Sequence, residues 1–326
     1  MALADVAGAK VAMVFPGQGS QFVGMGRAIH DASEAARRVF AQADELLGFP
    51  LARLCFAGPA EELEDTINAQ PAILTVSAAT LEAIRERAQA AGARIEPGVV
   101  AGHSLGEFTA LVAAGVLDFP AALRLVRERG RFMKEAGEER PGGMAAVIGL
   151  DEEVLVEVCA EAGREGIVGV ANANCPGQTV ISGEIGALLR AMELAKERGA
   201  RRVARLGISI ASHSPLMARA STQFGELVAK LPLRAPAVPV VGNVTGRAIT
   251  TVEGVRQELA HHVERPVNWT KSVRAMVDFG ATTFVEVGPG QVLSGLIKRI
   301  NRDVTTLGPG DLGLDLPAGD RPAPAG

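Results

Sequence analysis

The sequence predicts an α/β protein with a mainly parallel sheet and a second, smaller unit inserted into it. Three observations support this prediction. Short apolar runs alternate with helical patterns, as expected when helices cover both faces of a parallel sheet. Between residues 144 and 207 the expected elements follow the order βαββαβ, which is typical of a ferredoxin-like unit. One apolar run also leads directly into a glycine-flanked serine, as in a strand-to-helix elbow.

Composition argues against several classes of function. The 326 residues are 48% apolar, which allows a large core, and the net charge of −4 argues against bulk attraction to nucleic acid or to an anionic membrane. The three cysteines are widely spaced and form no C-x-x-C pair, so neither a disulfide framework nor a metal site is indicated. No signal peptide or transmembrane segment is predicted, and we therefore expect a cytoplasmic protein.

The first expected strand covers residues 10–15 and ends at a Pro-Gly pair. The loop after it, Gly-Gln-Gly-Ser at residues 17–20, lacks the third glycine of a dinucleotide fingerprint, because that position is Phe22. It also lacks the Gly-Lys-Ser/Thr of a phosphate loop. Two interpretations stay open: a plain strand-to-helix connection, or a loop whose backbone N–H groups stabilise negative charge on a substrate oxygen.

Helical patterns cover residues 28–47, 60–68 and 71–91, and the next expected strand is 97–101. That strand leads into Gly-His-Ser-Leu-Gly at residues 102–106. Glycines two residues before and after a serine allow a sharp turn that exposes the hydroxyl at a helix N-terminus. Ser104 is therefore the candidate nucleophile, although a chain with 38 glycines also produces this pattern by chance.

A helix over residues 121–136 carries the second notable feature. Arg129 has hydrophobic neighbours three and four residues away, which places its guanidinium on the apolar face of the helix. A buried cation is costly unless it meets an anion. Two partners are open at this point: a protein carboxylate in an internal salt bridge, or an acidic substrate.

Shorter elements follow after residue 138. We expect strands at 144–150, 167–173, 178–182 and 201–207, with helices at 151–162 and 184–198. This order predicts an inserted ferredoxin-like domain over residues 139–207. Residues 1–138 and 208–306 then form the large domain, with later strands at 238–241 and 283–287. The tail, 307–326, is rich in Gly, Pro and Asp and is expected to be disordered.

A serine hydroxyl needs a base at neutral pH, and histidine is the usual one. Of the five histidines, His103 adjoins the serine and should point away from it, and three others lie in or at the end of helices, where a structural role is simpler. His213 follows the apolar segment 208–210 in a loop that leads into a helix. Because α/β sites assemble in loops at the carboxyl ends of strands, His213 is the candidate base.

Taken together, these stretches resemble the malonyl-CoA:acyl carrier protein transacylases and the acyltransferase domains of fatty-acid and polyketide synthases. The resemblance runs nearly end to end, through motifs at residues 15–21, 70–71, 102–107, 129–130, 174–178, 212–217, 266–269 and 286–290. That family combines a hydrolase-like α/β domain with a ferredoxin-like insertion, in agreement with the architecture predicted above.

The resemblance implies a ping-pong acyl transfer in fatty-acid synthesis. Ser104, activated by His213, would take the malonyl group from malonyl-CoA and pass it to the phosphopantetheine thiol of acyl carrier protein. Backbone N–H groups of Gln18 and Leu105 would form the oxyanion hole. Arg129 would bind the malonyl carboxylate, which a planar guanidinium does bidentately. Coenzyme A thioester is implied as a substrate, with no permanently bound cofactor and no metal.

Further site residues are implied by the same resemblance. Asn174 and Gln70 would contact the substrate, and a backbone carbonyl, assigned to His262, would orient the catalytic histidine. The family usually has glutamine at that position, which puts any side-chain role of the glutamine in question. Ala211-Ser212, just before the base, resembles synthase domains that accept methylmalonyl units, so polyketide-type specificity is an alternative.

Two functions of other classes also fit parts of the sequence. A serine hydrolase or thioesterase would share the elbow, the oxyanion loop and the base, but it normally has an acidic residue between serine and histidine. Asp118 and Asp151 are available there, yet both stand at helix starts, where capping explains them. A non-catalytic module that binds the carrier protein would be expected to lack the serine, histidine or arginine, and all three are present.

An acidic carrier protein requires a local basic surface on a net acidic enzyme. Five basic residues gather near the last helix and strand of the inserted unit, either as a docking surface or as a solvated face: Lys196, Arg198, Arg201, Arg202 and Arg205.

Overall fold

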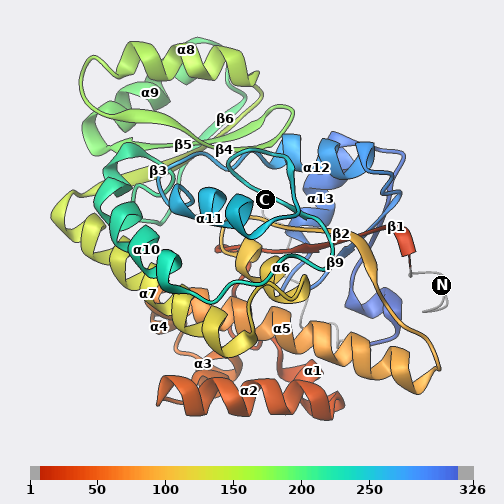
Figure 1. Cartoon of the computed structure of the whole chain (residues 1–326). Helices are drawn as coiled ribbons and strands as arrows, with labels where there is room; N and C mark the ends of the chain where they lie inside the picture. The colour runs from red at the N-terminus through yellow and green to blue at the C-terminus, as the bar shows by residue number, and fades with distance from the viewer. Residues whose placement is uncertain (1–7, 315–326) are drawn as a thin grey trace.

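A computed structural model of the chain describes residues 8–314, and residues 1–7 and 315–326 lie outside the described part. At its centre is a six-stranded sheet in the order β10-β9-β1-β2-β7-β8 (Figure 1). Every neighbouring pair is parallel except β7 and β8, so the predicted mainly parallel sheet is confirmed. The strands are β1 (Gly8–Phe15), β2 (Pro97–Gly102), β7 (Val240–Val241), β8 (Ala248–Ile249), β9 (Thr283–Glu286) and β10 (Thr305–Leu307).

Helices cover both faces of this sheet because its central strands are apolar on both sides. Along β1, Val11, Met13 and Phe15 belong to one core cluster, whereas Ala12 and Val14 belong to the other. The first cluster packs against α1 (Arg27–Ala32), α2 (Glu34–Leu47), α3 (Leu51–Ala57), α4 (Ala60–Glu64), α5 (Thr66–Ala90), α6 (Gly106–Ala113), α7 (Phe119–Glu139), α10 (Ala218–Lys230) and α11 (Val252–Ala260). The second packs against α12 (Trp269–Asp278) and α13 (Val292–Ile300).

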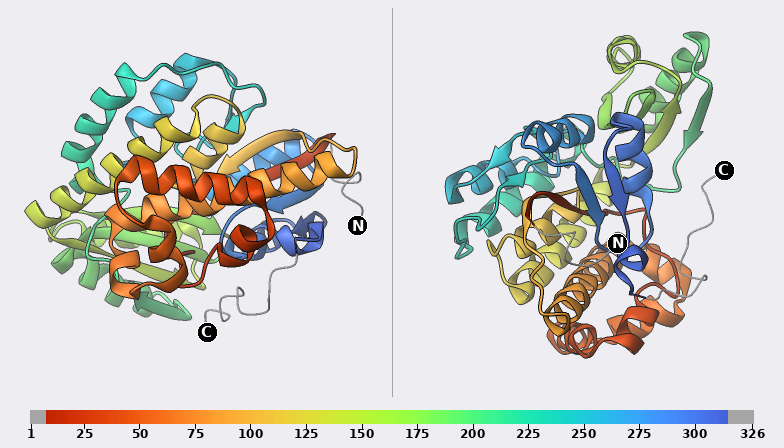
Figure 2. Two further views of the ribbon diagram at one scale, coloured as in Figure 1. Left: turned by 90° about the horizontal axis from the view of Figure 1, so that it is seen from below. Right: turned by 90° about the vertical axis from the view of Figure 1, so that its right-hand side faces the viewer.

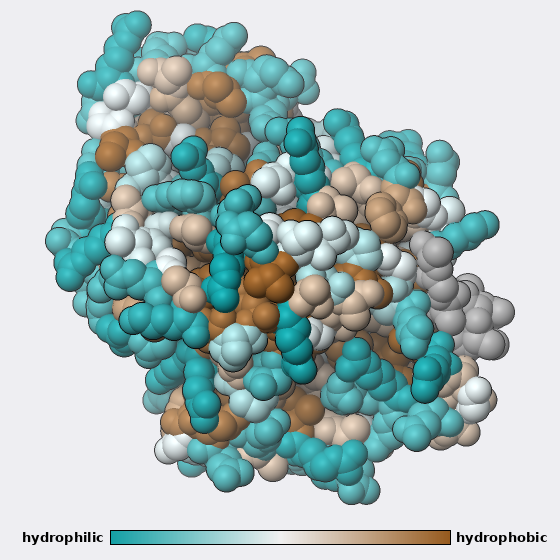
Figure 3. Space-filling model, viewed as in Figure 1, coloured by the Kyte–Doolittle hydropathy of each residue, from teal (hydrophilic) through white to brown (hydrophobic). Residues whose placement is uncertain are grey.

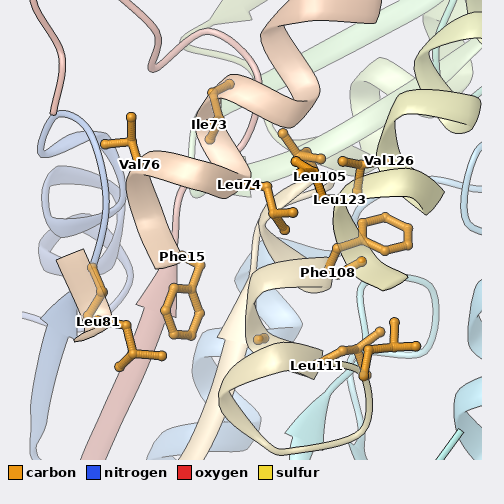
Figure 4. Packing of buried hydrophobic residues seen from close by; sticks show 14 of the residues in the cluster. Phe15, Ile73, Leu74, Val76, Leu81, Leu105, Phe108, Leu111, Leu123 and Val126 are labelled. Atoms are coloured by element: carbon orange, nitrogen blue, oxygen red, sulfur yellow. The ribbon is translucent and has the colours of Figure 1, made fainter. Parts of the chain in front are cut away.

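The elbow segment is anchored in the first of these clusters. Figure 4 shows Leu105, Phe108 and Leu111 among side chains of the neighbouring helices, including Leu74 of α5 and Val126 of α7. All five are at most 1% exposed. The turn that carries the candidate nucleophile therefore rests on a fully buried apolar core.

Helix α5 differs from the sequence prediction, which placed a break between residues 68 and 71. The helix begins at Thr66, where the Asp65 side chain accepts a hydrogen bond from the backbone N–H of Ile67, and it continues through Pro71. A proline inside a helix has no N–H to donate to the carbonyl four residues back. That carbonyl belongs to Ile67, and Arg127 of α7 donates to it instead, at 2.8 Å. A long-range contact therefore replaces the missing helical hydrogen bond.

A second, four-stranded sheet is inserted between α7 and the later part of the chain. Its strands, β3 (Gly142–Ile148), β4 (Val168–Cys175), β5 (Gln178–Glu184) and β6 (Arg202–Arg205), are all antiparallel and have the order β4-β5-β3-β6. Helices α8 (Glu152–Ala162) and α9 (Ile185–Glu197) share a core with this sheet. The unit projects from the main body (Figure 2, right) and has the predicted ferredoxin-like order. The exact domain limits stay a prediction.

The inserted sheet meets the main body close to the elbow. The backbone N–H of Val267 donates to the carbonyl of Ala171 in β4, and the N–H of Ala173 donates to the carbonyl of Val267. These two hydrogen bonds join the inserted sheet to the main body beside the cleft between the two sheets.

The prediction that residues 307–326 are disordered is wrong for residues 307–314. Leu307 ends strand β10, and a 3-10 helix follows at Pro309–Leu312. Leu312 and Leu314 are buried, which gives this segment an apolar anchor that its composition did not indicate. Residues 315–326 of the predicted tail lie outside the described residues.

The surface is largely hydrophilic on one face (Figure 3), and the helices of residues 8–314 are too short or too polar to span a membrane, as the composition predicts. The face in Figure 3 is largely hydrophilic, with hydrophobic residues in small groups. Within residues 8–314, no helix is both long and apolar enough to cross a membrane.

The contact between Arg127 and Ile67 predicts a specific loss of stability. In Arg127→Met the Ile67 carbonyl loses the Arg127 donor and Oδ1 of Asn68 loses the same partner, and we expect the free energy of unfolding to fall by about 1–3 kcal/mol. Urea unfolding followed by circular dichroism measures this. The control is Arg124→Met, an exposed position on the same helix, which should change stability by less than about 0.5 kcal/mol. Equal effects of the two substitutions would contradict the assignment.

Candidate active site

Ser104 occupies a strained turn between β2 and α6. Its φ angle is 48°, and among residues 8–314 the only other non-glycine residue with a positive φ is His213, at 57°. Such conformations cost free energy and concentrate at functional sites. The flanking glycines are required by space: a Cβ on Gly102 would lie 1.9 Å from the backbone of Gly106, and one on Gly106 would lie 2.0 Å from the carbonyl oxygen of Phe15. The pattern is therefore a true elbow and no accident of composition.

The structure brings His213 to this serine. Its Nε2 lies 2.8 Å from the Oγ of Ser104, and its Nδ1 lies 2.9 Å from the carbonyl oxygen of Arg265. A carbonyl can only accept, so Nδ1 carries the proton and Nε2 is free to accept the hydroxyl proton. Burial, with the nearby charge of Arg129, holds the pKa of His213 well below its usual value. The imidazole is therefore a neutral base.

The predicted orienting carbonyl of His262 is wrong, because the carbonyl that accepts from His213 belongs to Arg265. Helix α11 ends at Ala260 and two turns follow, in which the N–H groups of residues 264 and 265 use the carbonyl of His261. Arg265 stands before Pro266, and a residue before proline is held in an extended conformation that leaves its carbonyl free for a distant partner. The side chain of His262 is buried elsewhere in the site.

Asn243, which follows strand β7, braces the elbow and was missed at the sequence level. Its Nδ2 donates to the carbonyl of Gly102 and its Oδ1 accepts from the backbone N–H of Ser104, both at 2.6 Å. Its own backbone N–H donates to Oε2 of Glu107, at 2.9 Å. The only signal in the sequence is a polar residue one glycine after a short apolar run, at the carboxyl end of a strand that neighbours β2.

The two predicted oxyanion-hole residues lie on either side of the serine. The loop after β1 packs against the elbow so closely that a Cβ on Gly17 would lie 2.2 Å from the carbonyl oxygen of His103. Within the described residues, the backbone N–H groups of Gln18 and Leu105 donate no hydrogen bond. Leu105 also stands at the N-terminus of α6, the positive end of the helix dipole. Both groups are available to an oxyanion, and their role stays a prediction.

Arg129 is 1% exposed, and its guanidinium is hydrogen-bonded to neutral groups. Its Nη1 donates to Oε1 of Gln70 at 2.8 Å, and its Nη2 donates to Oγ of Ser104 at 3.2 Å. Burial lowers the pKa of Arg129 to about 9, and Glu107 opposes this shift from a distance. Within residues 8–314, no Asp or Glu oxygen lies within 4.0 Å of its guanidinium. Of the two partners left open by the sequence, the internal salt bridge is not formed.

Gln70 and Asn174 stand behind the cavity wall. Gln70 is fully buried and contacts Arg129, while its Nε2 donates to Oγ1 of Thr66 at 2.9 Å. Oδ1 of Asn174 lies 2.8 Å from Nε2 of His103. Neither side chain lines the cavity in front of Ser104, so the structure places them as supports of site residues, and direct substrate contact stays a prediction.

The cavity in front of the serine lies between the two sheets and encloses about 100 Å³. Ser104, His213, Arg129 and Gln18 line it from the main body, together with apolar side chains, and the inserted sheet contributes Met144 and other residues. Among residues 8–314, no group of three or more histidine, cysteine or acidic side chains could hold a metal ion. The site is thus a small cavity lined by a serine hydroxyl, a neutral imidazole and a guanidinium.

Comparison with known proteins shows the family to which this chain belongs. The model of the acyl transferase domain family matches residues 12–307, which defines the class as an acyltransferase. The malonyl CoA-acyl carrier protein transacylase of Bacillus subtilis is 45% identical over 303 residues, or 93% of this chain and 94% of that protein. That of Escherichia coli K12 is 45% identical over 289 residues, covering 89% and 92%. The chain belongs to this family of malonyl CoA-acyl carrier protein transacylases.

Solved structures of transacylases have the same fold as this chain. The malonyl-CoA:acyl carrier protein transacylase of Xanthomonas oryzae superposes with a TM-score of 0.88 at 43% identity, covering 94% of this chain and 97% of that one. A complex of a type II PKS acyl-carrier protein with its malonyl-transacylase has a TM-score of 0.87 at 40% identity, covering 92% and 95%. The hydrolase-like fold with its inserted sheet is therefore confirmed.

Removal of the Asn243 brace should affect both stability and rate. In Asn243→Ala the backbone groups of Gly102 and Ser104 lose their partner, and we expect a loss of about 1–3 kcal/mol in stability. Displacement of the hydroxyl should also slow acylation of the serine by at least about 10-fold. Denaturant unfolding and the rate of acyl-enzyme formation measure the two effects. Asn301→Ala, at the end of α13, is the control, and a rate unchanged by Asn243→Ala would refute the brace.

The lowered pKa of His213 predicts a pH dependence. An imidazole whose pKa is depressed in the folded enzyme stays neutral, and able to accept the serine proton, below the usual histidine value of 6.5. We therefore expect the rate of Ser104 acylation to be unchanged as pH falls through 6.5 and to decline only at more acidic pH. The acylation rate at each pH is measured by intact-mass spectrometry of samples quenched at successive times. A midpoint at or above pH 6.5 is the contrary result.

Proposed function

We propose that this chain transfers a malonyl group from coenzyme A to the phosphopantetheine thiol of acyl carrier protein, through an ester on Ser104. One observation carries the proposal: the buried guanidinium of Arg129 has no carboxylate partner among the described residues and lies 3.2 Å from the nucleophilic oxygen. A buried cation beside a nucleophile requires an anion at that place. An acyl group with a free carboxylate supplies it.

The first half-reaction follows from the positions of Ser104 and His213. His213 Nε2 takes the hydroxyl proton while Oγ attacks the thioester carbon, and the backbone N–H groups of Gln18 and Leu105 stabilise the negative oxygen. The carbon–sulfur bond then breaks, and the sulfur of coenzyme A leaves with the proton held by His213. The product is a malonyl ester on Ser104.

The second half-reaction reverses these steps with a different thiol. The phosphopantetheine thiol gives its proton to His213 and attacks the ester carbonyl, and the same N–H groups stabilise the intermediate. The carbon–oxygen bond to Ser104 breaks, and Oγ recovers the proton. Coenzyme A thioester is thus a substrate in this scheme.

The alternative of a serine hydrolase lacks support in the site. A backbone carbonyl, and no carboxylate, accepts from His213. Asp118 caps helix α7 by accepting from the N–H of Ala121, and Asp151 stands at the start of α8. Asp118 therefore serves a helix start, as its sequence position indicated, whereas Asp151 occupies the N-cap position of α8 without a side-chain capping hydrogen bond.

Carrier-protein docking is proposed at the basic edge of the inserted sheet. Arg201, Arg202 and Arg205 are exposed at strand β6, and the next residue after that strand, Leu206, lines the cavity. Arg198 pairs with Glu157 and Glu161, at 3.6 and 3.0 Å. An acidic partner bound along β6 would thus lie at the mouth of the site.

Arg129→Ala tests the proposed acyl group. The substitution should lower kcat/KM for malonyl loading on the order of 100-fold, because a buried carboxylate loses its cation. Acetyl loading, which needs no cation, should change far less. Loading is followed by intact mass after incubation with each coenzyme A thioester, and Arg124→Ala serves as the exposed control. Equal losses for both acyl groups would refute the role of Arg129, and a wild-type chain that forms no malonyl ester would refute the proposed function.

A further inference from the structure

A second imidazole lies directly behind Arg129. His262, in the turn after α11, has a fully buried side chain. Its Nδ1 lies 3.4 Å from Nη2 of Arg129, and its Nε2 lies 3.6 Å from Oε2 of Glu107 in α6. Its ring also packs edge-on against Phe108, with centroids 5.1 Å apart. The ring therefore stands between the cation of the site and the carboxyl group beneath the elbow.

The chemistry of these neighbours fixes the tautomer of His262. A guanidinium has donors and no acceptor, so Nδ1 must accept from Arg129. Burial and the charge of Arg129 hold the pKa of His262 well below its usual value, so the ring is neutral and its proton is on Nε2. That proton faces the Glu107 carboxyl group, just beyond hydrogen-bond length. Arg129 thus donates to Nδ1 of His262, and the N–H at Nε2 of His262 points toward Glu107.

We propose that His262 is a positioning residue that holds the Arg129 guanidinium for acyl groups with a free carboxylate, and so sets the preference for them. This inference rests on the proposed malonyl transfer. Gln70 accepts from Nη1 and His262 accepts from Nη2, so two separate segments of the chain determine the plane of the guanidinium. A guanidinium with a fixed plane presents its remaining donors in fixed directions to a carboxylate, among them Nε, which has no partner within the described residues.

Competition for Nη2 explains why the loss of His262 would matter. The same nitrogen also donates to Oγ of Ser104, at 3.2 Å. Without the acceptor of His262, the serine oxygen is the only partner of Nη2 within the described residues, and the cation is drawn toward the nucleophile and away from the place of the acyl carboxylate. An imidazole that served only to pack against Phe108 would have no such effect.

The test compares His262→Phe with His262→Asn. Phenylalanine keeps an aromatic ring against Phe108 and removes both nitrogens, whereas the Oδ1 of asparagine can replace the acceptor at the Nδ1 position. His261→Ala is the matched control, because His261 is the exposed neighbour and pairs with Glu264. For each chain, kcat and KM are measured for loading of Ser104 from malonyl-CoA and from acetyl-CoA, and thermal unfolding is recorded in parallel.

We expect His262→Phe to lower kcat/KM for malonyl-CoA by about 10-fold to 100-fold, mainly through KM, because one hydrogen bond to a charged group is lost. Acetyl loading should change by less than about 3-fold. His262→Asn should recover most of the malonyl preference, and His261→Ala should match the wild type. If His262→Phe does not fold, His262→Ala removes the same nitrogens. The ratio of kcat/KM for malonyl-CoA to kcat/KM for acetyl-CoA is then compared between His262→Ala and the wild type.

Two results overturn the inference: equal losses for the two acyl groups in the variant without ring nitrogens, or no recovery by asparagine in a chain of normal stability. Both leave the proposed function intact as long as the wild-type chain forms the malonyl ester. A wild-type chain that takes up no malonyl group overturns the proposed function itself, and with it the inference.

Discussion

The burial of one cation is the constraint on which the rest of the site depends. Arg129 is on the apolar face of α7, where a guanidinium is costly unless its donors are satisfied. Gln70 of α5, His262 after α11 and Ser104 before α6 each accept one hydrogen bond from it, and all three are neutral. Three separate segments must therefore meet at α7, and no carboxylate within residues 8–314 pairs with the cation.

The same cation influences the ionisation of its surroundings. Burial is the main cause that lowers the pKa of both His213 and His262, and the charge of Arg129 acts in the same direction on each. Burial raises the pKa of Glu107 to about 8, while Arg129 opposes that shift. A neutral imidazole is what a general base requires, so the charge of Arg129 helps to keep His213 unprotonated.

The sequence was sufficient for the residues whose position is set locally, and insufficient for those set by contacts between segments. The elbow glycines indicated Ser104, and helical periodicity placed Arg129 on an apolar face. The roles of Asn243 and of the Arg265 carbonyl were not predicted. Asn243 acts through a side chain 139 residues from Ser104 in the sequence. Arg265 acts through a backbone oxygen, which has no sequence signature. The helix break expected at Pro71 failed for a related reason: Arg127 satisfies a carbonyl from another helix.

Ser104 and His213 both adopt strained backbone conformations, and both are held by neutral partners. An amide side chain fixes the serine and a backbone carbonyl fixes the histidine. A carboxylate would serve either purpose, but one placed close to the guanidinium of Arg129 would pair with it and occupy its donors. Neutral supports avoid this competition, and the carboxyl group of Glu107 lies on the far side of His262, 3.6 Å from its Nε2. The geometry that holds the nucleophile and the geometry that receives an anionic acyl group are therefore one arrangement.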